Sequence, residues 1–213
     1  MLDLFAEDSP WQEPLAEGAV ILRRRARARS EELMTLVEQV AAENPFRHRI
    51  TPGGHRMSVA MTNCGDSGWT TDSRGYQYSE QDNLSGQRWP AMPPLFRQLA
   101  VTCAREAGFN GFNPDACLLN RYQPGAKLTL HQDKDERDLR QPIVSVSLGL
   151  PAIFLFGGFE RGDACQRVLL EHGDVVVWGG PSRLRYHGIL PLKPGIHPLA
   201  GAFRFNLTFR RAR

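Results

Sequence analysis

The sequence has few cysteines, and none of them is spaced as a metal or redox motif. Its 213 residues include four cysteines, and no two of these form a C-x-x-C pair. Zinc knuckles and dithiol redox centres depend on such pairs, so neither class is indicated. Unpaired cysteines suit a reducing compartment, and we expect a cytoplasmic protein.

Long apolar runs and a secretion signal are missing as well. No apolar stretch approaches the roughly 20 residues needed to span a bilayer. The N-terminal segment MLDLFAEDSPW is acidic and lacks the basic-then-apolar order of a signal peptide. We therefore expect no membrane partner and a chain that is mature from its first residue.

No internal repeat or low-complexity linker divides the chain. Hydrophobic residues make up 41% and charged residues 23%, as in an ordinary globular domain, and a single core grows comfortably to this length. We expect one domain over residues 1–213, and a monomer. The net charge of +3 permits a polyanionic partner without requiring one.

Two helices are expected in the first half of the chain. Ser30 is a good N-cap for a helix whose apolar stripe runs through residues 33–40. Asn44-Pro45 ends that helix. A second helix is expected over residues 94–107, with Gly108 as its C-terminal cap glycine.

From Asp115 onward the pattern is that of short strands. CLLNRY and KLTLHQD, joined by the turn QPGA, predict one hairpin, and RVLLEHGDVVVWGG predicts another that turns at residues 172–174. Helices followed by many short strands predict an α+β domain. Its centre is expected to be a β-sandwich or a jelly-roll barrel (a double-stranded β-helix core) over residues 115–213, with flanking helices outside.

Residues 45–90 are expected to form a substrate-recognition lid. Much of this stretch is rich in Gly, Ser, Thr, Asn and Asp, yet it carries Trp69, Tyr76, Tyr78 and Trp89. Two roles fit these rings: they cover the edge of the core, or they stack on a flat ligand.

His131, Asp133 and His187 form the candidate metal site. Residues two apart on a strand point to the same side, so His131 and Asp133 share a face, and His187 is the best candidate for a third ligand. Two histidines and one carboxylate leave one face of an octahedron open for a co-substrate and O2, as in non-haem Fe(II) oxygenases. Because H-x-D is common by chance, surface or structural histidines are the alternative.

The last predicted strand, FRFNLTFR, strengthens the metal-site interpretation. Its alternate residues Arg204, Asn206, Thr208 and Arg210 form a polar, cationic face, and the residues between them are apolar. That polar face meets water, or it lines the barrel interior and binds a dicarboxylate through charge-assisted hydrogen bonds.

Asn120 and Tyr122 share a face of the strand before the QPGA turn. If Tyr122 pairs with Lys127 across that turn, then Leu118 opposes His131. Asn120 and Tyr122 then lie beside the metal ligands.

Taken together, these motifs resemble the AlkB family of nucleic-acid dealkylating dioxygenases, over essentially the whole chain. The motifs that carry the resemblance are N-R-Y at 120–122, H-x-D at 131–133, the distant His187 and R-x-N-x-x-x-R at 204–210. Longer matching stretches are TPGG at 51–54, PGAKLTLHQDKDE at 124–136 and LLEHGDVVVWGG at 169–180.

The resemblance implies an Fe(II)- and 2-oxoglutarate-dependent dioxygenase that demethylates 1-methyladenine and 3-methylcytosine. Its implied partner is alkylated single- or double-stranded DNA, preferentially single-stranded, with RNA as a further substrate. It consumes O2 and 2-oxoglutarate and releases succinate, CO2 and formaldehyde. The residues implied to bind Fe(II) are His131, Asp133 and His187. Those implied to hold 2-oxoglutarate are Asn120, Tyr122, Arg204, Asn206 and Arg210. Those implied on the substrate side are Trp69, Tyr76, Tyr78, Asp135, Glu136 and Arg161.

The residue chemistry agrees with such a substrate, because both lesions are cationic at neutral pH. Asp135 is placed to face a charged base, and Trp69 and Tyr76 are placed to stack on it by cation–π attraction. A methylated Watson–Crick edge pairs poorly, which lowers the cost of flipping the base out. Plain solvated charge in DKDERD is the alternative for Asp135 and Glu136.

Two rival functions fit parts of the pattern. The same iron chemistry on a protein side chain or metabolite would not need the aromatic-rich lid. A non-catalytic barrel would be expected to lack a metal ligand or a 2-oxoglutarate arginine, and this sequence has all of them.

Overall fold

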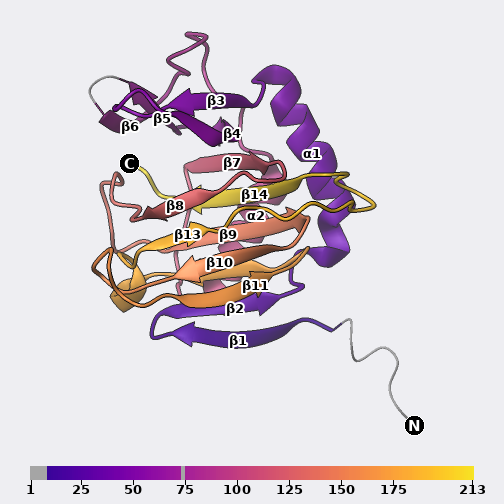
Figure 1. Ribbon diagram of the computed structural model, residues 1–213, viewed down its shortest axis with the longest axis vertical. Helices are drawn as coiled ribbons and strands as arrows, with labels where there is room; N and C mark the ends of the chain where they lie inside the picture. The colour runs from indigo at the N-terminus through magenta and orange to yellow at the C-terminus, as the bar shows by residue number, and fades with distance from the viewer. Residues whose placement is uncertain (1–8, 73–74) are drawn as a thin grey trace.

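Two antiparallel β-sheets face one another in the computed structural model, which describes residues 9–72 and 75–213 (Figure 1). The large sheet has the order β1 (Trp11–Ala16), β2 (Ala19–Arg23), β12 (Val175–Trp178), β9 (Ile143–Gly149), β14 (Arg204–Arg210), β7 (Ala116–Tyr122), β4 (Arg56–Gly65), β3 (Arg47–Ile50). The small sheet has the order β11 (Gln166–Leu170), β10 (Ala152–Phe156), β13 (His187–Ile189), β8 (Leu128–His131). A separate hairpin is formed by β5 (Gly68–Asp72) and β6 (Gly75–Ser79). This is the predicted jelly-roll arrangement.

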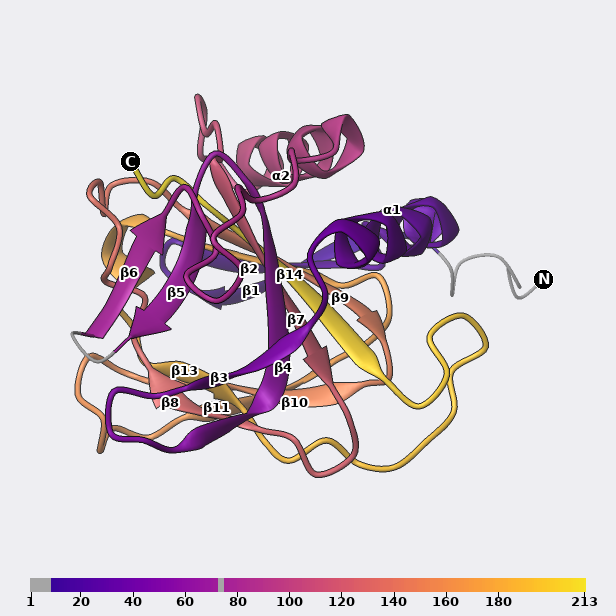
Figure 2. The same cartoon turned by 90° about the horizontal axis from the view of Figure 1, so that it is seen from above.

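The two helices cover the outer face of the large sheet, and the small sheet lies on its other side (Figure 2). Helix α1 (Ser30–Glu43) ends before Asn44-Pro45 as predicted, and α2 (Pro94–Glu106) is followed by Gly108 at φ +91°. The prediction that Ser30 caps α1 is wrong. A 3-10 turn over Arg27–Arg29 runs straight into the helix, so Arg29 takes the cap position without a side-chain hydrogen bond.

Strand β14 has the predicted alternation. Phe205, Leu207 and Phe209 pack in the core beneath the helices, whereas Arg204 and Arg210 line a cavity between the sheets. The apolar face of β14 therefore packs against the helices, and its polar face points into the interior of the barrel.

Both predicted hairpins are wrong in their pairing. The QPGA turn carries the chain from β7 in the large sheet to β8 in the small sheet, where β8 pairs with β13. The turn at residues 172–174 likewise joins β11, which pairs with β10, to β12, which pairs with β2 and β9. Consecutive strands of a jelly roll change sheets, so sequence neighbours meet across the interior and not within one ladder.

Strands β1 and β2 extend the large sheet at one edge and were not anticipated. Their two-residue turn places Gly18 at φ +73°, and a Cβ there would lie 2.5 Å from the carbonyl oxygen of Gly179. Only glycine fits such a close approach.

Residues 45–90 divide into two parts. Strands β3 and β4 complete the large sheet at its other edge, while the β5–β6 hairpin projects from the end of the barrel (Figure 1). The acidic segment MLDLFAED, on which the argument against a signal peptide mainly rests, lies outside the described residues. No helix within residues 9–72 and 75–213 has the length and apolar character to cross a membrane.

Candidate metal and co-substrate site

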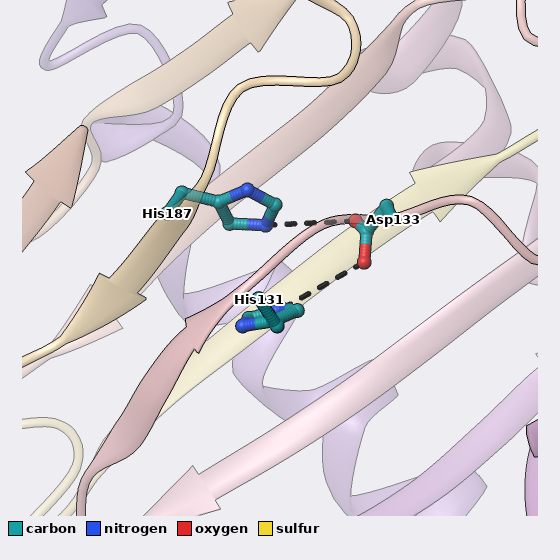
Figure 3. Close-up of side chains that lie close together, drawn as sticks. All are labelled: His131, Asp133 and His187. Atoms are coloured by element: carbon teal, nitrogen blue, oxygen red, sulfur yellow. Dashed lines mark ion pairs between the residues drawn. The ribbon is translucent and has the colours of Figure 1, made fainter. Parts of the chain in front are cut away.

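The three predicted metal ligands lie close together, and two of them come from neighbouring strands of the small sheet (Figure 3). His131 ends β8, His187 begins β13, and the two are direct partners across the ladder. Asp133 follows His131 by two residues, and each of its oxygens lies 3.7 Å from the Nε2 of one histidine. The ligand atoms of the three side chains all lie within 4.8 Å of one another. Among the described residues, this is the one His/Cys/Asp/Glu group so arranged.

Backbone carbonyls fix which nitrogen of each histidine faces the site. The Nδ1 of His131 lies 2.8 Å from the carbonyl oxygen of Thr129, and that of His187 lies 3.1 Å from the oxygen of Arg185. Since a carbonyl only accepts, each Nδ1 carries the hydrogen, and each Nε2 lone pair is free for a metal. Burial and the neighbouring His131 lower the pKa of His187 to about 3, so its ring is in the neutral, metal-binding form.

Asp133 is held as a carboxylate by Arg210. The guanidinium donates to Oδ2 from Nε at 3.0 Å and from Nη2 at 2.7 Å. Burial acts to raise the pKa of Asp133, but Arg210 and the two histidines outweigh it and hold the pKa well below its usual range. Two neutral imidazoles and one carboxylate on one side are the donor set that suits a non-haem Fe(II).

A cavity of about 480 Å³ opens beside the triad, and its floor contains a buried arginine with unused donors. Arg204 is 1% exposed, lies 5.0 Å from the ring centroid of Tyr122 and donates from Nη2 to the Ser147 hydroxyl at 3.0 Å. Its Nε and Nη1 have no partner, and neither has Oδ1 of Asn120. Buried polar groups are seldom left unpaired, and burial lowers the pKa of Arg204. An incoming carboxylate satisfies this cation, so the floor fits 2-oxoglutarate.

The other predicted 2-oxoglutarate residues line the same cavity. Asn120 donates to Asn206 at 3.2 Å, which links β7 to β14. The predicted β7–β8 pairing is wrong. Asn120 and Tyr122 nevertheless line the same cavity as the metal ligands, which they face from the opposite sheet. The inner face of β9 also contributes, through Ser145 and Ser147. The alternating serines of PIVSVSLGL were the sequence signal for that polar face.

At the mouth of the cavity, the structure brings together four of the six predicted substrate residues: Trp69, Tyr76, Asp135 and Arg161. The rings of Trp69 and Tyr76 stack with centroids 5.2 Å apart and planes 18° apart. The indole of Trp69 donates to Oδ2 of Asp135 at 3.1 Å. Arg161 reaches the rim with its guanidinium over the ring of Tyr186.

Tyr78 and Glu136 are not among the residues that line the cavity. The Tyr78 hydroxyl donates to Oε1 of Glu136 at 2.6 Å, and Oε2 of Glu136 pairs with Arg183 at 3.0 Å. Arg183, buried and close to Asp133, was missed in the sequence, since nothing distinguishes one arginine of PSRLRYH from another.

The arginine run at residues 23–29 lies away from the cavity and is largely paired within the protein. Arg23 binds Glu13 and Asp174, and Arg25 binds Glu106 through two hydrogen bonds of 2.6 and 2.8 Å. None of these arginines lines the cavity. Their pairing points to a structural role.

Comparison with known proteins gives the family and the fold that this chain resembles. A family model for the 2OG-Fe(II) oxygenase superfamily matches residues 18–210. The alpha-ketoglutarate-dependent dioxygenase AlkB of Salmonella typhimurium is 62% identical over 212 residues, and that of Escherichia coli is 64% identical over 212 residues. Each alignment covers all of this chain and 98% of the relative. The solved structure of OsALKBH1 superposes with a TM-score of 0.84 at 28% identity, covering 94% of this chain and all of that chain.

Proposed function

The chain belongs to the 2OG-Fe(II) oxygenase superfamily, and we propose that it removes methyl groups from alkylated bases in nucleic acid. It is an Fe(II)- and 2-oxoglutarate-dependent dioxygenase, with O2 as the second co-substrate. The proposed substrates are 1-methyladenine and 3-methylcytosine in DNA, preferentially single-stranded, with RNA as a further substrate. The products are the repaired base, formaldehyde, succinate and CO2.

The observation that carries this proposal is the composition of the cavity mouth. A pair of stacked aromatic rings and a carboxylate open onto the same cavity as the metal triad. One oxygen of Asp135 is engaged by Trp69, and the other is available to a cationic base or its exocyclic amine. A flat, positively charged ring is therefore matched by stacking and by charge at once.

Each group of residues has a separate task in the proposed reaction. When bound, Fe(II) with 2-oxoglutarate and O2 supplies the oxidation of the N-methyl group. His131, Asp133 and His187 would hold the metal, and three protein ligands would leave it able to bind co-substrate and O2. Arg204 orients the co-substrate through its unpaired donors. The rim residues present the methyl group of the flipped base to the open side.

The proposal is tested by mass spectrometry of a single-stranded oligonucleotide that carries one 3-methylcytosine. Incubation with the protein, Fe(II), ascorbate and 2-oxoglutarate is expected to remove one methyl group, to release one formaldehyde for each base repaired, and to release at least as much succinate. An unmethylated oligonucleotide is the control. If the methylated base persists while 2-oxoglutarate is consumed, the substrate is not this lesion.

Further parts of the proposal concern where and with whom the protein acts. We propose a monomer in the cytoplasm that binds alkylated nucleic acid. Free thiols support a reducing compartment, because no disulfide joins the four cysteines. Size-exclusion chromatography with light scattering checks the oligomeric state.

A further inference from the structure

Two side-chain hydrogen bonds join the lid, defined here as the β5–β6 hairpin, to the segment beside the metal site, in addition to the hydrogen bonds that Asn63 of β4 and Trp89 make to the hairpin backbone. On β5, Trp69 donates to Asp135, which is exposed. On β6, Tyr78 donates to Glu136 over only 2.6 Å, and this carboxylate is buried. The Tyr78 contact is the shorter of the two and the better shielded from water, so it is the stronger attachment.

Both oxygens of Glu136 are engaged by the protein itself. Oε1 takes the Tyr78 hydroxyl and lies 3.3 Å from Nε of Arg210, while Oε2 takes Nη2 of Arg183 at 3.0 Å. Glu136 is 7% exposed and does not line the cavity. A carboxylate in this position is matched to its protein partners and not to a ligand.

Arg183 uses every nitrogen of its guanidinium and is 3% exposed. Nε donates to the carbonyl oxygen of Gln141 at 2.9 Å, Nη1 to the carbonyl oxygen of Asp133 at 2.6 Å, and Nη2 to Glu136. Residues 132–135 belong to no helix or strand, so no ladder holds this segment. Arg183 therefore holds the chain at Asp133, which is the metal ligand, and at Glu136, which directly follows the segment.

We propose that Arg183 and Glu136 are positioning residues that connect the backbone of Asp133 to the lid through Tyr78. The placement of the hairpin over the base and the geometry of the metal ligand are then set by one network. Tyr78 and Glu136, expected from the resemblance to contact substrate, position the lid in this proposal. The connection exists without substrate, and only its consequence for turnover rests on the proposed function.

The first test is backbone hydrogen exchange of the full-length, metal-free protein. Tyr78→Phe removes one hydrogen bond to a charged group and is expected to speed exchange in residues 75–79 by about tenfold or more, leaving residues 128–135 unchanged. Arg183→Lys keeps the charge but loses the three-way fork, and is expected to speed exchange in both segments. The control is Tyr186→Phe, the same chemical change at a tyrosine whose hydroxyl has no hydrogen bond among the described residues; neither segment should respond.

The double variant decides whether the two contacts form one connection. Once Arg183→Lys has loosened Glu136, adding Tyr78→Phe is expected to change lid exchange little further. Full addition of the two effects, or unchanged lid exchange in Arg183→Lys, overturns the proposal. Glu136→Gln, which keeps the side-chain size, replaces Arg183→Lys in this comparison if the lysine variant does not fold.

Metal binding and kinetics separate positioning from a merely structural role. Arg183→Lys is expected to weaken binding of Mn(II) alone, measured by calorimetry, whereas Tyr78→Phe leaves it unchanged and raises KM for the methylated oligonucleotide more than it lowers kcat. Equal Mn(II) affinity in Arg183→Lys and wild type contradicts the link to Asp133. If the wild type demethylates nothing, the proposed function fails, while the exchange and Mn(II) results still decide this inference.

Discussion

The cavity has two regions that hold their side chains in different ways. The floor consists of the metal ligands and the residues expected to bind 2-oxoglutarate, and the rim consists of the four residues at the mouth, Trp69, Tyr76, Asp135 and Arg161. On the floor, Arg204 is 1% exposed and is packed between strands of the large sheet. On the rim, Tyr76 is 46% exposed and rests on one neighbouring ring. A buried side chain is fixed by the strands packed around it, whereas an exposed one adjusts at little cost. The floor is therefore suited to binding the metal and the co-substrate, which are the same in every turnover. The rim is suited to accepting bases of different shape.

The largest effect is expected at the metal ligands, which belong to the floor. His131→Ala, Asp133→Ala and His187→Ala should each abolish turnover while the fold survives, because an open three-ligand site has none to spare. Formaldehyde release measures turnover, and circular dichroism checks that each variant is folded. Near-normal activity of Asp133→Ala would remove it from the ligand set.

The co-substrate arginines are expected to come next. Arg204→Ala should raise the KM for 2-oxoglutarate by an amount equivalent to about 2–5 kcal/mol, the cost of removing one half of a buried charge pair. Arg210→Ala should also raise it, and in addition weaken metal binding, because Arg210 donates twice to Asp133. Titrations of 2-oxoglutarate and Mn(II) on both variants separate them. An unchanged KM in Arg204→Ala would move the anchor elsewhere.

The rim is tested first at its aromatic wall. Trp69→Ala should lose stacking of roughly 1–3 kcal/mol, which is tens of fold in kcat/KM for the methylated oligonucleotide. Decarboxylation of 2-oxoglutarate without nucleic acid should continue, because the floor is intact. If that uncoupled reaction stops too, floor and rim are not separable.

A smaller, selective effect is expected at Asp135. Asp135→Ala removes the rim carboxylate, so repair of cationic 3-methylcytosine should fall roughly tenfold more than repair of neutral 1-methylguanine. Single-turnover rates on the two lesions give the ratio directly. An equal fall on both would mean that Asp135 supports Trp69 and does not sense charge.

The smallest effect is expected at the outer rim and is seen in salt dependence. Arg161 has no carboxylate partner among the described residues and faces the cavity, whereas Arg25 is bound to Glu106. Arg161→Gln should reduce the slope of log K against log salt by roughly 0.7–0.9, the share of one phosphate contact. Arg25→Gln should leave the slope unchanged. The reverse pattern would assign nucleic-acid binding to the arginine run.

The floor was more predictable from sequence than the rest, and the reason is periodicity. The two-residue period of FRFNLTFR places Arg204, Asn206 and Arg210 on one face whatever the neighbouring strands are. His131 and Asp133 follow the same rule. These assignments needed only local geometry, which is why they survived the wrong pairing of β7 with β8.

Strand partners and the support behind the rim were not predictable in this way. A tight turn such as QPGA looks the same whether the next strand stays in the sheet or leaves it, and only the packing of the whole barrel decides. The interactions of Glu136 with Tyr78 and Arg183 join residues far apart in sequence. Within DKDERD, Glu136 looks like a surface charge, although its carboxylate is buried and contacts Tyr78, Arg183 and Arg210.

The change of sheet at the QPGA turn has a thermodynamic consequence. The metal ligands come from the small sheet or the residues that follow it, and the co-substrate residues come from β7 and β14 of the large sheet. A metal with its bound dicarboxylate would thus add a further link between two layers that are already joined by apolar side chains and by the contact between Asp133 and Arg210. A ligand that binds only the folded state stabilises it by mass action. Binding of metal and 2-oxoglutarate is therefore expected to raise the free energy of unfolding and to resist separation of the two sheets.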